Sequence, residues 1–113
     1  MTAVLDTTVA VCRYEALLPE RGVAALLPGG DQVAVFRTHG GEVYALSNID
    51  PFSGAAVLSR GIVGDRGGVP YVASPLHKQA FDLRTGACLD DPAVTVRTYA
   101  ARVAAGAVLI GTP

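Results

Sequence analysis

The sequence predicts an all-β protein, an antiparallel β-sandwich or barrel with one short helix. Apolar and polar residues alternate with a period of two along most of its 113 residues, and glycine, proline and aspartate separate the alternating runs. A succession of about eight short strands of this kind is typical of a sandwich or barrel. Half of the residues are hydrophobic and 17% are charged, which provides enough apolar side chain for a packed core. We therefore expect residues 1–113 to form a single domain.

The expected strands are short runs that follow one another along the chain. They cover residues 8–12, 22–27, 32–38, 42–48, 70–74, 80–83, 94–103 and 107–111. Paired glycines in "LPGGDQ" (27–32) and "THGGEV" (38–43) favour tight hairpins, because glycine adopts the positive φ values that such turns need. Gly86 and Gly106 are expected to mark further reversals near the end of the chain.

Two segments depart from the alternating pattern. "RYEALL" (13–18), closed by Pro19, is the candidate helix, and we expect Leu17 and Leu18 to face inward. Residues 48–69 are rich in glycine and polar residues, so we expect an irregular segment there. Irregular segments of this length in small domains usually have a function or contact a partner.

Charge and hydropathy exclude several classes of function. Nine Lys and Arg residues against ten Asp and Glu residues give a formal charge of −1, so we expect no general binding of nucleic acid or of an anionic membrane. No apolar run approaches the roughly 20 residues that cross a bilayer, and the first residues do not resemble a secretory signal. The sequence therefore indicates a soluble, cytoplasmic protein. Cys12 and Cys88 could pair on count alone, but in such a chain we expect two ordinary buried thiols.

Two short segments resemble the metal-binding loops of Rieske domains. "NID" (48–50) and "SPLH" (74–77) each follow an expected strand, as do the Cys-x-His and Cys-x-x-His loops that hold a Rieske [2Fe–2S] cluster. The resemblance continues through "QAFDLRTGACL" (79–89), in which Phe, Asp-Leu and a Thr-Gly turn follow the second loop. The order of the loops and their strand context both match the Rieske plan.

The cluster ligands themselves are replaced. Asn48 and Ser74 stand at the two thiolate positions and Asp50 at one imidazole position, so His77 alone keeps its ligand type. Thiolates are what hold iron–sulfur clusters, and amide, hydroxyl and carboxylate groups are poor substitutes for them. We therefore expect no metal centre at these degenerate ligand positions.

The two loops together are similar to those of a particular family. "NIDPFS" (48–53) and "SPLHKQ" (74–79), within a similarity that covers about residues 9–111, resemble the small subunit of assimilatory NAD(P)H-dependent nitrite reductase. The resemblance implies an accessory subunit of a cytoplasmic complex that reduces nitrite to ammonia. It implies no catalytic residue and no cofactor in this chain, and it assigns FAD, an iron–sulfur cluster and sirohaem to the large subunit. The sequence contains no glycine-rich phosphate loop for a nucleotide.

The resemblance also suggests where the large subunit binds. The former cluster loops, about 48–54 and 74–80, would lie together at one end of the β structure, where Rieske domains meet redox partners. Apolar anchors inside a polar rim are the composition expected of such a docking surface. The expected partner-binding residues are Phe52, Pro75, Leu76, His77 and Lys78.

Ordinary roles are expected for the other polar residues. Asp50 precedes a proline, where an aspartate accepts backbone N–H bonds and shapes a loop, and Asp82 ends a strand beside a turn. Ser74 has no nucleophile elbow and no evident base, so we do not expect catalysis. His39 is expected to be a solvated turn residue, and His77 a loop residue that bonds to its neighbours or to a partner.

Two other classes of function stay open. One is a Rieske-type ferredoxin with an unusual cluster, serving an aromatic-ring oxygenase, which requires iron and visible absorbance. The other is a free-standing interaction or regulatory domain, which requires no large flavin- and sirohaem-containing partner.

Overall fold

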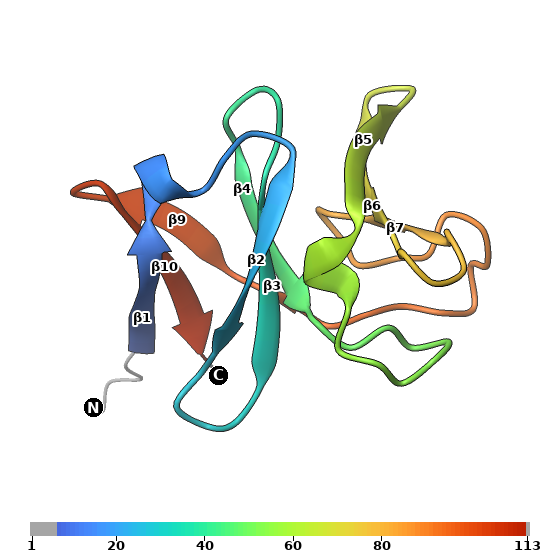
Figure 1. Cartoon of the computed structure of the whole chain (residues 1–113), viewed down its shortest axis with the longest axis horizontal. Helices are drawn as coiled ribbons and strands as arrows, with labels where there is room; N and C mark the ends of the chain where they lie inside the picture. Colours follow the sequence, from blue (N-terminus) through green and yellow to red (C-terminus); the bar gives the residue numbers. More distant parts are fainter. Residues whose placement is uncertain (1–6, 113) are drawn as a thin grey trace, which may run out of the picture.

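The computed structural model describes residues 7–112 as ten β-strands and two short 3-10 helices (Figure 1). The elements in chain order are β1 (Thr7–Arg13), η1 (Tyr14–Ala16), β2 (Arg21–Leu26), β3 (Gln32–Arg37), β4 (Val43–Ser47), η2 (Leu58–Arg60), β5 (Ile62–Arg66), β6 (Val69–Ala73), β7 (Ala80–Asp82), β8 (Thr98–Tyr99), β9 (Ala101–Ala104) and β10 (Ala107–Thr112). All pairings between these strands are antiparallel, which confirms the predicted all-β class. Neither helix within the described residues has the length or apolar character needed to cross a membrane.

The strands form three small sheets. β1, β10 and β9 form the terminal sheet, β2, β3, β4 and β8 form the middle sheet, and β5, β6 and β7 form the third sheet. Figure 1 shows the terminal sheet on the left, the middle sheet upright in the centre and the third sheet on the right. The middle sheet therefore separates the other two.

Strand β3 shows how the middle sheet contributes to two cores. Successive side chains of a strand point to opposite faces of its sheet. Ala34 and Phe36 accordingly pack into a first core with residues of the third sheet, whereas Val33 and Val35 pack into a second core with residues of the terminal sheet. All four side chains are buried. This explains why the run is continuously apolar in the sequence.

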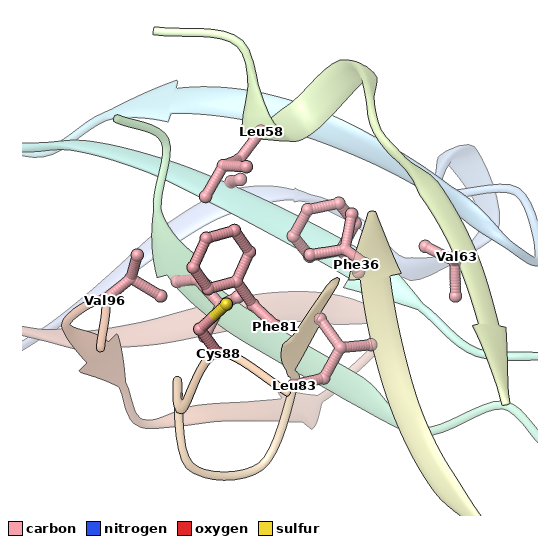
Figure 2. Close-up of a cluster of buried hydrophobic side chains, with 10 residues drawn as sticks. Phe36, Leu58, Val63, Phe81, Leu83, Cys88 and Val96 are labelled. Atoms are coloured by element: carbon pink, nitrogen blue, oxygen red, sulfur yellow. The ribbon is translucent and has the colours of Figure 1, made fainter. Parts of the chain in front are cut away.

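The first core is the one that supports the former cluster loops. Figure 2 shows Phe81 of β7 among Leu58 of η2, Val96 and the Cys88 thiol, all of which belong to this core. η2 follows the first loop, and β6 and β7 flank the second. Packing in this core therefore fixes the chain on both sides of the loops.

Two parts of the predicted strand pattern are wrong. The segment 48–69, expected to be irregular throughout, contains β5, which pairs with β6 through a hairpin at Gly67 and Gly68. The strand expected over residues 94–103 is divided into β8 and β9. The reason for the division is that β8 pairs with β4 in the middle sheet, whereas β9 pairs with β10 in the terminal sheet. The chain crosses between sheets at this point.

The predicted helix is a single 3-10 turn, η1, and one of its predicted orientations is wrong. Leu17 is buried as expected, but Leu18 is 60% exposed. The backbone is already extended at Leu17, with φ −92° and ψ 102°. Neighbouring side chains in an extended chain point in opposite directions, so only one of these two leucines reaches the core.

The predicted turns agree with the structure, and of the two thiols expected to be buried, that of Cys88 is buried and that of Cys12 only partly so. Gly30 and Gly41 have φ values of 97° and 94° in the two predicted hairpins, and Gly106 has 78° between β9 and β10. Both cysteines are free: Cys88 is buried in the first core and Cys12 is half-buried in β1. Burial raises the pKa of the Cys12 thiol above its ordinary value.

Candidate functional site

The two former cluster loops contain turns of the same geometry, a first turn at residues 50–54 and a second turn at residues 74–78. In each turn, the carbonyl oxygen of the first residue accepts a hydrogen bond from the N–H of the fifth, at 2.7 Å and 2.9 Å respectively. The side-chain oxygen of the first residue also accepts a bond from the N–H of the third, at 2.8 Å and 3.3 Å. Pro51 and Pro75 occupy the second position, where a fixed φ suits a turn and no N–H is needed.

A third turn at residues 82–86 repeats this geometry. Its corresponding hydrogen bonds measure 2.7 Å between the first and fifth residues and 2.8 Å from the third N–H to the Asp82 carboxylate. The fifth residue has a positive φ in all three turns: 76° at Gly54, 63° at Lys78 and 81° at Gly86. Lys78 is thus the one side-chain-bearing residue in a position that otherwise holds glycine.

A buried hydrogen bond joins the first turn to the second. The Ser74 hydroxyl donates to Oδ2 of Asp50, whose other oxygen, Oδ1, accepts from the Phe52 N–H. Asp50 is 0% exposed and Ser74 is 1% exposed. Each side-chain oxygen of the buried Asp50 therefore has a hydrogen-bond partner, as buried polar groups require. The predicted role of Asp50 as an acceptor of backbone N–H bonds is confirmed.

Asn48 ties the start of the first loop to η2. Its side-chain oxygen, Oδ1, accepts a hydrogen bond of 2.7 Å from the Ser59 N–H, and its carbonyl oxygen accepts one of 3.1 Å from the Leu58 N–H. Asn48 is 2% exposed. The residue at this former thiolate position is therefore part of the packing between the loop and the first core.

The donor set at the degenerate ligand positions does not fit a [2Fe–2S] cluster. The side-chain oxygens of Asn48, Asp50 and Ser74 all accept hydrogen bonds from backbone N–H groups, and none of these residues supplies a thiolate. His77 is exposed and forms no hydrogen bond or ion pair with another residue between 7 and 112. Within that part of the chain, no group of three or more His, Cys, Asp and Glu side chains is placed to hold a metal ion.

Apolar side chains of the same loops face outward. Phe52 and Leu76 occupy the third position of the first and second turns and are 37% and 49% exposed. Ile49, between the buried residues 48 and 50, is 37% exposed. We call this surface the loop face; its residues are Ile49, Phe52, Pro75, Leu76, His77 and Lys78.

Phe52 belongs to the loop face and also supports the fold. Its ring centroid lies 6.2 Å from that of Phe81, with a 45° angle between the ring planes. This spacing is typical of an interacting aromatic pair. The first turn is therefore held by this ring contact with the first core as well as by the bond between Asp50 and Ser74.

Sequence reasoning missed two residues of this region. Ile49 was not predicted, although the alternation of Asn48, Ile49 and Asp50 between inside and outside follows from an extended chain. Asp90 was not predicted either; its Oδ2 accepts a 2.8 Å hydrogen bond from the Ala80 N–H at the end of the second loop, and Oδ1 lies 3.4 Å from Arg66. Asp90 lies 10 positions beyond Ala80, and no local pattern marks it as its partner.

The third turn carries an ion pair rather than an apolar tip. Arg84 lies 3.1 Å from the Asp82 carboxylate, which is almost buried. Burial alone would raise the pKa of Asp82, but the hydrogen bonds and charge of Arg84 outweigh it and hold this pKa below its ordinary value. The third turn therefore shares the backbone geometry of the other two but lacks their exposed apolar residues.

A groove elsewhere on the surface is separate from this site. It has a volume of about 640 Å³ and opens between the 38–42 turn and the β5–β6 hairpin. Its lining includes Glu42, Asp65 and Arg84, and His39 stands at it as a 92% exposed side chain, in agreement with the prediction of a solvated residue. None of the residues of the loop face lines it.

Comparison with known proteins places this geometry in a family. Residues 7–111 match the family of Rieske-like [2Fe-2S] domains. The chain is 50% identical over 99 residues to the nitrite reductase (NADH) small subunit of Escherichia coli K12, which covers 87% of this chain and 91% of that protein. A crystal structure from Mycobacterium tuberculosis, described as an NADH-dependent nitrite reductase small subunit, has a TM-score of 0.94 at 52% identity, covering 97% of this chain and 98% of that one.

Two further matches bear on partners and cofactors. The nitrite reductase [NAD(P)H] large subunit of Klebsiella oxytoca contains a stretch 45% identical over 102 residues, which covers 90% of this chain and 10% of that protein. The ferredoxin of carbazole 1,9a-dioxygenase from Nocardioides aromaticivorans is more distant, with 32% identity and a TM-score of 0.80 over 95% of this chain and 99% of that one. The chain belongs to the Rieske-like [2Fe-2S] domain family, in the group that contains the nitrite reductase small subunits.

Proposed function

We propose that this chain is the accessory small subunit of a cytoplasmic NAD(P)H-dependent nitrite reductase, the complex that reduces nitrite to ammonia. It holds no catalytic residue and no cofactor, while FAD, an iron–sulfur cluster and sirohaem belong to the large subunit. It binds that subunit through the loop face. The residues assigned to this contact are Phe52, Pro75, Leu76, His77 and Lys78.

One observation carries the docking assignment: the two loops keep their frame but turn their ligand positions inward. Asp50 and Ser74 bond to one another, and the adjacent Phe52 and Leu76 remain exposed at equivalent positions. An apolar pair held at fixed positions by two linked turns is suited to a partner, because little order is lost when it is buried. Exposed apolar residues with a polar rim are typical of interface centres.

The match within a large subunit supports the choice of partner. A stretch similar to almost all of this chain is part of the Klebsiella oxytoca large subunit. Domains that are joined in one protein are held beside each other at high effective concentration. Separate chains need an interface to achieve the same proximity, and the loop face supplies a candidate for it.

Co-expression with the large subunit tests this proposal through the substitution Leu76→Asp. We expect the carboxylate to reduce the amount of large subunit that co-purifies with this chain by at least about tenfold, because an unpaired charge at an interface centre is costly. NAD(P)H-dependent nitrite consumption by the same preparations should fall in step. Circular dichroism checks that the variant is folded.

Leu26→Asp is the matched control. Leu26 is 70% exposed on β2, outside the two loops, so the same change of chemistry should leave co-purification intact. Equal loss with both variants, or full retention with Leu76→Asp, would show that the loop face is not the interface. Failure of the unaltered chain to retain the large subunit would refute the subunit assignment itself.

Similarity to ferredoxins favours a second candidate, an electron carrier with its own cluster. That function needs soft donors directed at two iron ions. The buried amide, carboxylate and hydroxyl at positions 48, 50 and 74 are instead bonded within the protein. The accessory-subunit proposal therefore accounts for these residues better.

A further inference from the structure

The backbone at Lys78 is unfavourable for a lysine. Its φ of 63° lies in the left-handed region, where side-chain-bearing residues are strained and glycine is not. The equivalent residues of the first and third turns, Gly54 and Gly86, are glycines with φ values of 76° and 81°. The three turns share their hydrogen bonds, so the stability of the turn alone would favour glycine at residue 78 as well. Strain that persists at such a position is a pointer to function.

The charge of Lys78 has no ion-pair partner among the residues that the structure describes. The carboxylate of the first turn, Asp50, is 0% exposed and bonded to Ser74, so it does not present its charge at the surface. Arg60, the last residue of η2, is exposed, and the adjacent Gly61 lies close to the carbonyl oxygen of Ala73, just before the second turn.

The loop face thus combines exposed apolar side chains with positive charge. Phe52 and Leu76 lie at the third positions of linked turns, and Lys78 ends the second of them. A surface that complements this one has an apolar centre and at least one carboxylate beside it.

We propose that Lys78 strengthens docking by binding a carboxylate of the large subunit, next to the apolar contact made by Phe52 and Leu76. This inference rests on the proposed docking of the loop face and adds the chemistry of the surface that receives it: apolar at its centre and acidic at the position facing Lys78. The lysine is retained in a strained conformation because its charge is used in the complex.

Three substitutions separate charge from backbone conformation. Lys78→Gly removes the charge and the strain, Lys78→Ala removes the charge and keeps the strain, and Lys78→Arg keeps both. Affinity for the large subunit should follow the charge at residue 78. We expect binding to be about fivefold weaker for the Gly and Ala variants and unchanged for the Arg variant. Biolayer interferometry at about 50 mM salt, where screening is weak, measures these affinities. The temperature of half-unfolding should follow conformation, rising by about 2–4 °C for Lys78→Gly alone.

Salt supplies an independent readout. Raising the salt concentration to about 0.5 M should weaken binding of the unaltered chain and of Lys78→Arg, and should have less effect on the two uncharged variants, because exposed charges are screened. A carboxylate partner predicts convergence of all four affinities at high salt.

Several outcomes would overturn the inference. Unchanged affinity of Lys78→Gly, retention of affinity by Lys78→Ala but not Lys78→Gly, or no rise in unfolding temperature for Lys78→Gly would each contradict it. If Leu76→Asp abolishes binding while the Lys78 variants bind normally, docking stands and the role of Lys78 is wrong. If neither residue matters, the docking proposal itself fails.

Discussion

At the scale of single residues, Asp50 occupies a former ligand position and has become part of the structure. Its Oδ1 and Oδ2 accept bonds from the Phe52 N–H and the Ser74 hydroxyl, and its backbone closes the first turn through Gly54 and Ala55. A buried carboxylate is tolerated only when its hydrogen bonds are made. Loss of one donor should therefore be more costly here than at the surface.

Ser74→Ala tests this dependence. The substitution leaves Oδ2 of the fully buried Asp50 without its hydroxyl donor, and we expect the free energy of unfolding to fall by about 2 kcal/mol. Ser53→Ala is the matched control, because the Ser53 hydroxyl is exposed and accepts only a 3.2 Å bond from the Ala55 N–H. Its cost should stay below about 0.5 kcal/mol. Urea unfolding measures both; equal costs would show that the buried pair adds no stability.

The same pair shows what the sequence can predict about this site. A bond from Asp50 to the nearby backbone is predictable, because aspartate before proline commonly shapes a turn. Its bond to Ser74 is not, since the two residues are 24 positions apart and only the packing of the middle sheet against the third sheet brings them together. Local patterns therefore predict the turns but not the contact that joins them.

At the scale of elements, the three equivalent turns differ in how closely the fifth residue is packed. A β-carbon on Gly54 would meet no atom within 4 Å, whereas one on Gly86 would overlap the backbone carbonyl of Val96. The backbone requirement is the same at both, with φ values of 76° and 81°. The pair therefore separates conformational strain from steric overlap.

Alanine substitutions at these two glycines should differ in cost. Gly54→Ala adds only left-handed strain and should lower the free energy of unfolding by about 1 kcal/mol. Gly86→Ala adds the clash with a backbone atom, which cannot move aside easily, and should cost about 3 kcal/mol. Thermal unfolding of both variants provides the comparison. A cost at Gly54 equal to that at Gly86 would show that packing against Val96 is unimportant.

Strand β5 explains the main failure of prediction for the elements. Its sequence, "IVGDR", has two apolar residues followed by glycine and charges, so no alternation is visible. A β-carbon at Gly64 would overlap the end of the Tyr71 side chain of β6, which would have to move aside. Packing between the strands thus favours a residue that weakens the local strand signal, although the paired glycines 67 and 68 do mark the hairpin.

At the scale of the whole molecule, β3 and β4 form a wall shared by the two cores. Leu46 and Phe36 lie in the first core, whereas Ala45 and Val35 lie in the second. A hairpin that contributes alternate side chains to both cannot leave one core without disturbing the other. The expectation of a single domain over residues 1–113 leads to a definite thermodynamic prediction.

Conservative truncations in the two cores should destabilise one common folding unit. Val72→Ala in the first core should cost about 2 kcal/mol, and Ile110→Val in the second about 1 kcal/mol, because both side chains are fully buried. Amide hydrogen exchange reports each sheet separately. Within one variant, the opening free energy of the slowest amides should fall equally in β3, β6 and β10, by the full cost of that variant. Faster exchange confined to the third sheet in Val72→Ala would instead mean that the loops and their core open independently, and the loop face would then be a mobile surface rather than a rigid one.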